Sequence, residues 1–409
     1  MTTVPEVAVR AVRTVVVDDP GPLLDLLPAA DPLAWVRGGD GLVGWGEATR
    51  LELAGTDPFA EASAWWTALV AGAEVHDDVR LPGTGLVAFG SFTFDRGRSV
   101  LVVPQVVVGR HGSTCWVTTV DGAAAPLDRR DPVRPPRRLE LVDRTAEQFT
   151  AAVADAVGRI RAGDLAKVVL AREVEANLDA PLDARWPLRR LAADYAGCWT
   201  FSVDRLVGAT PEMLVRLRDG TASSRVLAGT LRRSGDANRD ERMTTAFGRS
   251  IKDLEEHGYG VRSVVEALAR HCTEVDVPSA PFVLDLPNVL HLATDVTGTV
   301  ADGSTSLDLL ASLHPSAAVC GAPTATARGV IREIEGLDRG RYAGPVGWLD
   351  ARGDGEWGIA LRCAEVDADD ASRLRRFAGC GIVEGSRPDD ELAESNAKLL
   401  AMRSALSPG

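Results

Sequence analysis

Two acidic residues and a lysine near the end of the sequence share one face of an expected helix. Glu391, Glu394 and Lys398 stand at positions i, i+3 and i+7, a spacing that points the three side chains the same way. The helix would follow a glycine-rich strand and begin near Ser386 and Pro388, residue types that suit a helix start. Such carboxylates can bind a cation, or they can form a solvated acidic face that the helix dipole favours.

A second carboxylate pair lies earlier, in a segment that also has the pattern of a helix. Asp253 and Glu256 are three residues apart on one helical face, and His257 follows them. Two helices that each offer two carboxylates can face one another around a hard divalent cation such as Mg²⁺, which prefers oxygen ligands. The residues alone leave two interpretations open, a Mg²⁺ site or two solvated helix faces.

Lys167 and Glu212 are candidates for proton transfer. Lys167 interrupts an otherwise apolar strand, so it either reaches an edge of the sheet or is held in a cleft, where a lysine can act as a base. Glu212 follows the end of another strand and could supply the matching acid. Taken alone, each residue is better explained as an exposed charge at a strand edge or turn.

The composition is that of a globular protein. The 409 residues are 45% hydrophobic and 25% charged, enough to bury a large core, and the net charge of −13 argues against nucleic acid or an anionic membrane as a partner. The chain shows no secretory signal and no apolar run long enough to span a bilayer. Its six scattered cysteines, without a CxxC pair, are typical of reduced, buried thiols. We therefore expect a cytoplasmic protein and, since no obvious partner helix is present, a monomer.

The elements that must position these residues arrive as runs of strands rather than in strict alternation with helices. This favours an α+β fold with antiparallel sheets. We expect a mainly β part, residues 1–140, and a catalytic region, residues 141–405, within one folding unit, joined by a Pro/Arg-rich connection at 121–138. The expected strands are 33–37, 42–46, 86–90, 99–108, 166–172, 198–203, 205–210, 211–215, 289–300, 344–349, 357–366 and 374–383. The expected helices are 57–73, one ending at Gly163, 240–272, 306–313, 324–336 and the terminal helix.

Together these stretches resemble a known family. Residues from about 143 to 402 are similar to the chorismate-utilising enzymes, which include anthranilate, aminodeoxychorismate, salicylate and isochorismate synthases. The matching stretches, in family order, are 167–172, 208–212, 227–230, 250–253 with 256–257, 314–323, 342–347 and 379–398. The resemblance implies an anthranilate synthase component I-like fold, in which two large, mainly antiparallel sheets enclose the site with helices outside.

Three positions imply the isochorismate synthase branch of that family. Lys167 stands where isochorismate and salicylate synthases carry the base that activates water, and where anthranilate synthases have glutamine. Ala228 stands where aminodeoxychorismate synthases place a nucleophilic lysine, and Ala318 is the residue type of isochorismate synthases. The implied activity is Mg²⁺-dependent isomerisation of the small molecule chorismate, by water attack at C2 and loss of the C4 hydroxyl. Whether the product would serve menaquinone, siderophore or other biosynthesis stays open.

The resemblance also implies a role for individual residues. Lys167 would be the base and Glu212 the acid, while Arg362 and Lys398 would hold the enolpyruvyl carboxylate of the substrate. His314 would contact the substrate near the metal. The implied metal residues are Glu256 and Glu394, with Asp253 and Glu391 acting through bound water. The implied substrate-binding residues are Ala228, Gly229, Thr230, His314, Ala318, Tyr342, Arg362, Gly379, Gly381 and Lys398.

Departures from the family pattern are small. Cys380 replaces a common alanine and Ser395 the usual threonine, and similar changes occur at Ser316 and Ala317, so fine specificity is less firmly implied than activity. Two rival activities follow from the same resemblance: a salicylate synthase, which would go on to eliminate pyruvate, and an ammonia-using subunit paired with a glutamine amidotransferase. Lys167 argues against the second, because ammonia needs no base that activates water. A non-catalytic binding module would be expected to lose one of the four acidic positions.

Overall fold

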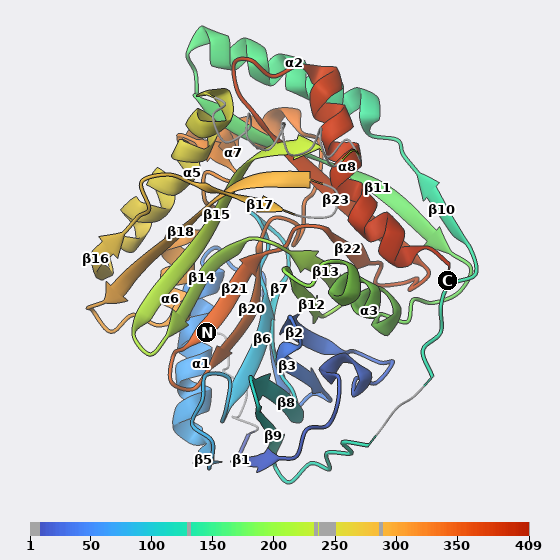
Figure 1. Cartoon of the computed structure of the whole chain (residues 1–409), viewed down its shortest axis with the longest axis vertical. Helices are drawn as coiled ribbons and strands as arrows, with labels where there is room; N and C mark the ends of the chain where they lie inside the picture. The colour runs from blue at the N-terminus through green and yellow to red at the C-terminus, as the bar shows by residue number, and fades with distance from the viewer. Residues whose placement is uncertain (1–8, 129–131, 233–235, 237–250, 286–288, 409) are drawn as a thin grey trace.

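The computed structural model describes residues 9–128, 132–232, 236, 251–285 and 289–408, and these residues form two large sheets with helices around them (Figure 1). Within this part of the chain the strand pairs are antiparallel except for β1 with β5. The α+β class expected from the sequence is therefore confirmed.

The larger sheet combines strands from both ends of the chain, in the order β10-β11-β23-β22-β13-β12-β2-β3-β8-β9-β1-β5, with β19 beside β11. Its strands are β1 (Ala11–Val17), β2 (Leu33–Arg37), β3 (Asp40–Trp45), β5 (Glu74–Asp77), β8 (Val106–His111), β9 (Thr114–Val120), β10 (Leu139–Val142), β11 (Lys167–Leu178), β12 (Trp199–Val203), β13 (Leu206–Thr210), β19 (Gly321–Ala322), β22 (Cys363–Val366) and β23 (Arg373–Ile382).

The smaller sheet has the order β16-β18-β15-β14-β21-β20-β6-β7-β4, with β17 beside β18. Its strands are β4 (Thr49–Leu53), β6 (Val87–Ser91), β7 (Ser99–Val103), β14 (Met213–Arg218), β15 (Thr221–Arg232), β16 (Cys272–Asp276), β17 (Phe282–Asp285), β18 (Val289–Val300), β20 (Pro345–Asp350) and β21 (Gly355–Ile359). Since β2 pairs with β12 and β6 with β20, strands from residues 1–140 complete both sheets. The division of the chain near residue 140 stays a prediction.

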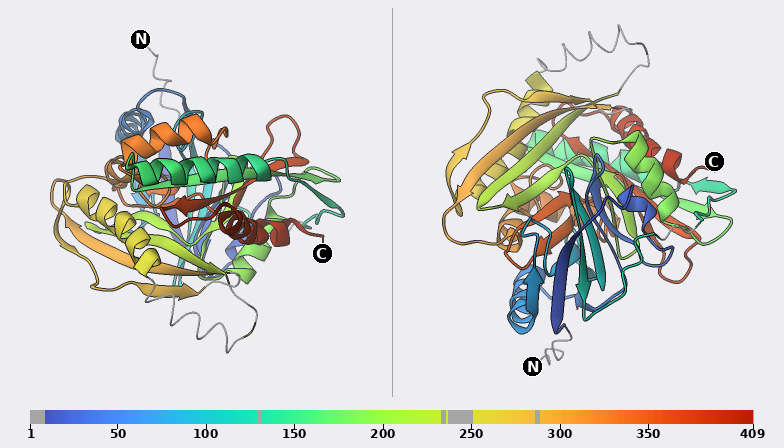
Figure 2. Two further views of the ribbon diagram at one scale, coloured as in Figure 1. Left: turned by 90° about the horizontal axis from the view of Figure 1, so that it is seen from above. Right: turned by 60° about the horizontal axis from the view of Figure 1, so that its bottom comes forward.

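The helices lie outside the sheets (Figures 1 and 2). Contacts join α2 and α7 to β11, α8 to β23, α3 to β12 and β13, α5 to β15 and β18, and α6 to α1 and β14. Their bounds are α1 (Pro58–Gly72), α2 (Ala146–Ala162), α3 (Arg185–Asp194), α5 (Ile251–Leu268), α6 (Ser306–Leu313), α7 (Thr324–Ile334) and α8 (Pro388–Leu406), and a short 3₁₀ helix η1 spans Leu23–Asp25. Among the described helices none is both long and apolar enough to cross a membrane.

Local sequence explains where several elements begin and end. Helix α2 ends at Gly163, whose φ of 88° suits a residue without a side chain. Pro388 opens α8, as expected, but Arg387 is its N-cap residue. The hydroxyl of Ser386 instead accepts a hydrogen bond from the backbone N–H of Val383 at 3.2 Å, so it stabilises the turn before the helix.

Two expected strands are each divided in the structure. The segment 99–108 forms β7 and β8, which are separated at Pro104, a residue that has no backbone N–H for a sheet. The segment 357–366 forms β21 and β22, which are separated by residues 360–362, where Arg362 has a φ of 49°. The expected helix at 240–272 is present as α5 from residue 251, and residues 240–250 lie outside the described part of the chain.

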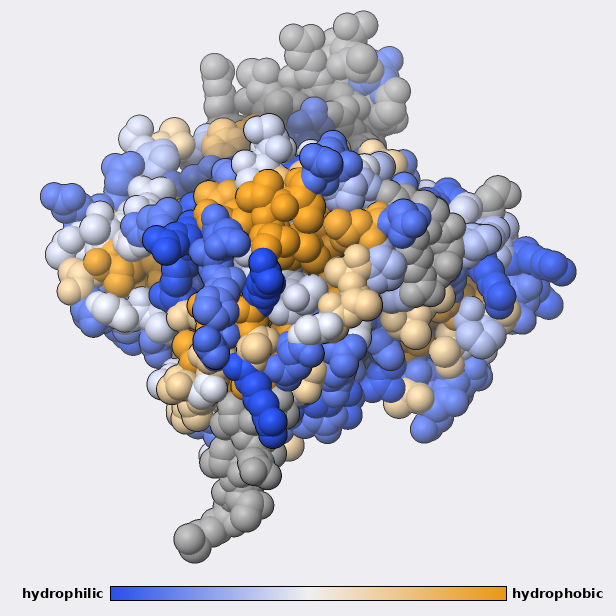
Figure 3. Space-filling view, turned by 90° about the horizontal axis from the view of Figure 1, so that it is seen from below, coloured by the Kyte–Doolittle hydropathy of each residue, from blue (hydrophilic) through white to orange (hydrophobic). Residues whose placement is uncertain are grey.

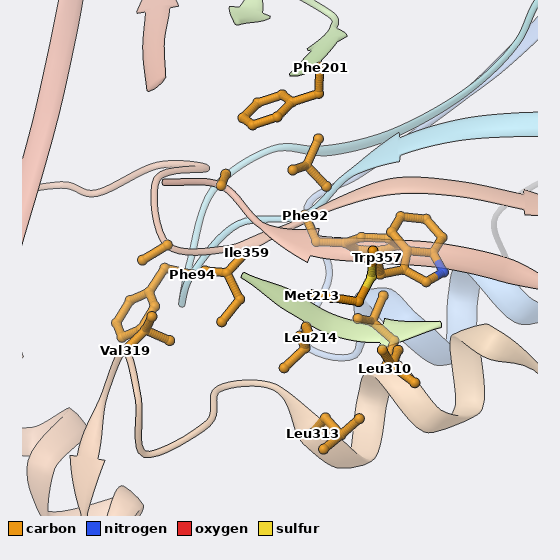
Figure 4. Close-up of a cluster of buried hydrophobic side chains, with 14 of the residues drawn as sticks. Phe92, Phe94, Phe201, Met213, Leu214, Leu310, Leu313, Val319, Trp357 and Ile359 are labelled. Carbon is orange, nitrogen blue, oxygen red and sulfur yellow. The ribbon is translucent and has the colours of Figure 1, made fainter. Parts of the chain in front are cut away.

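The main hydrophobic core includes residues of both sheets and of the helices that cover them. Phe92, Met213 and Trp357 pack there with residues of α6 (Figure 4). Val319 belongs to the same cluster and lies at its margin, so the core and the cavity described below share a wall. Seen from below, the surface also carries an apolar area bordered by hydrophilic residues (Figure 3).

Candidate active site

A cavity lies between the two sheets at the end where β11, β23 and α8 meet the turn between β13 and β14. Its empty volume is about 720 Å³, part of it open to solvent. It is lined by Val169, Pro211, Glu212, Leu227, His291, Ala318, Val319, Arg339, Tyr342, Ala343, Leu361, Arg362, Phe377, Ala378, Gly379, Gly381, Glu394 and Lys398. The predicted residues that the structure brings together in this wall are Glu212, Ala318, Tyr342, Arg362, Gly379, Gly381, Glu394 and Lys398.

Glu212 is a fully buried acid at the cavity. It lies in the turn between β13 and β14, with a relative exposure of 4%. Burial raises the pKa of its carboxyl group to about 8, although the backbone N–H of Leu227 and the charges of Lys167 and Lys398 oppose that rise. The carboxyl group is therefore mostly protonated near neutral pH, as a general acid must be.

Lys167 is buried at the start of β11. It has a relative exposure of 0%, and its charge acts on Glu212, so the predicted base and acid lie in one electrostatic environment. Lys167 itself does not form the surface of the cavity; Val169, two residues further and on the same face of the strand, does. An apolar strand containing a lysine thus holds that lysine inside the molecule and not at an exposed edge.

Arg362 presents a guanidinium group to the cavity. Its left-handed backbone, with a φ of 49°, lies between β21 and β22. One terminal nitrogen is 2.9 Å from Nε2 of His291, while Nη1 is buried and has no hydrogen-bond partner among the described residues. Burial lowers the pKa of the guanidinium. A buried donor without a partner is costly, so this atom fits an anionic ligand group.

Helix α8 and strand β23 form another wall of the cavity. The Nζ atom of Lys398 donates to the backbone oxygen of Gly379 at 2.8 Å and lies 2.6 Å from Oε1 of Glu394. The ion pair with Glu394 raises the pKa of Lys398 against the effect of burial. A Cβ atom at Gly379 would lie 2.9 Å from the backbone oxygen of Leu170 and 3.1 Å from the hydroxyl of Tyr342, so a side chain here would press against β11 and against Tyr342.

The acidic residues of α8 are close enough to share a cation. Ligand atoms of Glu391, Glu394 and Cys380 lie within 4.8 Å of one another. A hard divalent cation prefers the oxygen ligands that the two carboxylates offer, whereas a thiol is a poor ligand for such a cation. Asp253 and Glu256 belong to α5, which contacts β15 and β18, but their side chains lie outside the described part of the structure. The donor chemistry that is described therefore fits the predicted metal, with Glu394 at the cavity and Glu391 behind it.

Other predicted residues lie elsewhere. His314 packs against Phe94, and its Nε2 donates a hydrogen bond to the backbone oxygen of Phe94 at 3.0 Å; burial lowers the pKa of the imidazole to about 4. It does not line the cavity, so a direct substrate contact stays a prediction. Ala228, Gly229 and Thr230 belong to β15, directly after the cavity residue Leu227, and their side chains are not described.

Several cavity residues were not predicted. Val169 and Leu361 could have been found, since one shares a strand face with Lys167 and the other adjoins Arg362. His291 and Arg339 carry no local signal, because distant segments bring them to the site. The lining residues missed are Val169, Pro211, Leu227, His291, Val319, Arg339, Ala343, Leu361, Phe377 and Ala378.

Comparison with known proteins agrees with this geometry. Residues 121–407 match the family model described as chorismate binding enzyme. The chain is 39% identical over 272 residues to the isochorismate synthase DhbC of Bacillus subtilis (strain 168), a match that covers 64% of this chain and 68% of that one.

Solved structures are similar over almost the whole chain. One, assigned as the 2,3-dihydroxybenzoate-specific isochorismate synthase DhbC from Bacillus anthracis, has a TM-score of 0.79 and 32% identity, covering 95% of this chain and 99% of that one. The menaquinone-specific isochorismate synthase MenF from Escherichia coli has a TM-score of 0.78 at 23% identity, covering 98% and 96%, and shows likeness of fold alone.

Proposed function

The chain belongs to the chorismate-binding enzyme family, and we propose that within it the chain is an isochorismate synthase. Chorismate would be converted to isochorismate by attack of water at C2 and departure of the C4 hydroxyl. The observation that carries the proposal is a buried lysine whose charge acts on a cavity carboxyl group of raised pKa, because the reaction needs a base and an acid together. The isochorismate synthases to which the chain is similar support it.

Lys167 and Glu212 would divide the proton transfers. Lys167 would accept a proton from water as the water oxygen attacks C2, and the protonated carboxyl of Glu212 would donate one to the leaving C4 hydroxyl, which departs as water. Because the pKa of Glu212 is about 8, the donor is in the required form at neutral pH. The low polarity of a buried site strengthens both interactions with the substrate.

The cationic residues of the cavity would hold the substrate carboxylates. Arg362 offers the buried Nη1 atom, which has no hydrogen-bond partner in the part of the chain that the structure describes, and Lys398 forms an ion pair with Glu394. A guanidinium binds a carboxylate through a planar pair of donors, so it fixes orientation as well as charge. The backbone of Gly379 and Gly381 and the ring of Tyr342, stacked on Phe377 with centroids 5.1 Å apart, would confine the substrate ring.

Mg²⁺ is the cofactor that we propose for this site. Glu394 and Glu256 would hold it, with Glu391 and Asp253 orienting bound water. When bound it supplies positive charge to the ring carboxylate of the substrate. Glu394 would then exchange its contact with Lys398 for the metal, which leaves the ammonium group available to a substrate carboxylate.

Incubation of the purified protein with chorismate and Mg²⁺, followed by chromatographic identification of the product, tests the function. We expect isochorismate, formed without ammonia. Accumulation of salicylate and pyruvate would favour the salicylate synthase alternative, and turnover only with ammonia would favour an amine-adding enzyme. Absence of any conversion would overturn the proposal.

A further inference from the structure

Among the described residues, strand β11, which carries Lys167, is paired continuously along only one of its two edges, since β10 reaches only residues 175–178 of the other. Along one edge it pairs with β23 from Val168 to Asn177. Along the other edge β19 supplies only two residues, opposite Lys167 and Val168, and the last backbone bond there joins the N–H of Val169 to the oxygen of Cys320 at 2.8 Å. The chain then turns away at residues 316–319, so the next groups of β11 on this edge need other partners.

A buried ion pair supplies those partners. Nη2 of Arg339 donates to the backbone oxygen of Val169 at 2.7 Å, and Oε2 of Glu335 accepts from the backbone N–H of Ala171 at 2.8 Å. The two side chains are joined by two bonds of 2.6 Å and have relative exposures of 4% and 1%. Glu335, the C-cap residue of α7, and Arg339, four residues later, thus continue the hydrogen bonding of β11 where β19 stops.

The same guanidinium holds a second wall of the cavity. Nη1 of Arg339 donates to the backbone oxygen of Val319 at 3.1 Å, and the ring of Phe94 covers the group, 4.1 Å from the guanidinium carbon. Val169, Val319 and Arg339 all line the cavity, and Ala318 is the neighbour of Val319. One side chain therefore fixes the distance between the strand of Lys167 and the segment that carries Ala318.

We propose that the Glu335–Arg339 pair is a positioning device, which holds Lys167 and the Ala318–Val319 wall in register for the reaction. This inference rests on the proposed function for its kinetic consequence but not for its structural one. Neither residue transfers a proton in the mechanism above. Their effect passes through the backbone of Val169, Ala171 and Val319, so a change at Arg339 should alter the rate of chemistry more than substrate binding.

The test compares Arg339→Lys with a matched control, Arg341→Lys. Arg341 is two residues away, equally buried, and holds the backbone oxygen of Asp204 at 2.6 Å and Glu365 at 2.8 Å, but it does not line the cavity. Lysine keeps the charge and loses the planar fork. Glu335→Gln, which keeps the size of the side chain and removes its charge, is a second variant in case Arg339→Lys folds poorly.

Two measurements decide the outcome. Peptide-resolved hydrogen exchange should show opening of residues 167–172 and 316–320 increased about tenfold, the effect of one lost hydrogen bond, in Arg339→Lys and Glu335→Gln but not in Arg341→Lys. With chorismate and Mg²⁺, kcat should fall about a hundredfold while KM changes little. Unchanged local exchange, faster exchange without loss of kcat, or equal loss in the control overturns the proposal. If the parent protein makes no isochorismate, the proposed function fails, and hydrogen exchange alone decides the positioning role.

Discussion

Replacement of Glu212 by glutamine should make the free energy of unfolding fall less steeply as pH rises, because it removes a buried carboxyl group of raised pKa. In the folded protein the pKa of Glu212 is about 8, against an ordinary value of 4.5. Between these two values the folded state binds a proton that the unfolded state has released, so the free energy of unfolding falls as pH rises. Glutamine has nearly the same shape but no titratable group, so in Glu212→Gln this contribution to the fall in the free energy of unfolding is absent.

The magnitude follows from the displacement of the pKa. One pKa unit corresponds to about 1.4 kcal/mol, so the advantage of Glu212→Gln over the parent should grow by about 1.4 kcal/mol per pH unit above pH 4.5, level off above pH 8, and total at most about 5 kcal/mol. Urea unfolding of both proteins at several values between about pH 5.5 and 9 measures it.

Glu333→Gln is the control for this experiment. Glu333 is exposed, and its hydrogen bonds with Arg159 lower the pKa of its carboxyl group, so its substitution should shift stability by an amount that does not vary over this range. A difference between Glu212→Gln and the parent that stays constant, or shrinks as pH rises, would refute the reasoning. In the activity assay the parent should lose kcat as pH rises through about 8, and Glu212→Gln should be about 10²–10⁴-fold slower throughout because an amide cannot supply the proton.

Three further predictions concern the same cavity. Lys167→Ala should slow isochorismate formation by about 10²–10⁴-fold with an unchanged circular dichroism spectrum, and formation at the parent rate would remove the base assignment. Arg362→Lys should raise KM for chorismate about tenfold, since lysine cannot reproduce the planar donors; an unaltered KM in steady-state assays would contradict the carboxylate contact. Glu394→Gln should raise the Mg²⁺ concentration for half-maximal activity at least about tenfold and weaken Mg²⁺ binding in calorimetry, with Glu333→Gln again as the control. An identical Mg²⁺ titration would count against the metal role.

Much of the site could be predicted because its chemistry is local in sequence. The spacing of Glu394 and Lys398 predicts that they share a helix face, and in the structure Nζ of Lys398 lies 2.6 Å from Oε1 of Glu394. Gly379 and Gly381 alternate along one strand, so both face the same side. The two strand breaks were missed because they depend on single residues, Pro104 and the left-handed Arg362, that interrupt otherwise continuous apolar patterns.

The cavity residues that were not predicted are brought together by contacts between segments that are distant in the sequence. Arg339 reaches Val169 across 170 positions of the chain, and nothing in the neighbourhood of either residue indicates the other. His291 faces Arg362 across 71 positions because β18 and the break after β21 come together only in the folded protein. His314 shows the converse: it belongs to a family motif, yet it packs against Phe94 and is not among the described residues that line the cavity.

The pairing of β11 with β23 has a consequence for synthesis of the chain on the ribosome. Val169 and its partner Gly381 are separated by about 210 positions, which take about 10–40 s to translate at about 5–20 residues per second. Throughout that interval one long edge of β11 has no strand to pair with, and the wall formed by α8 has not been made. The cavity therefore forms after nearly all of the polypeptide has been translated, and a nascent chain that ends before residue 381 exposes an apolar strand edge to neighbouring chains and to chaperones.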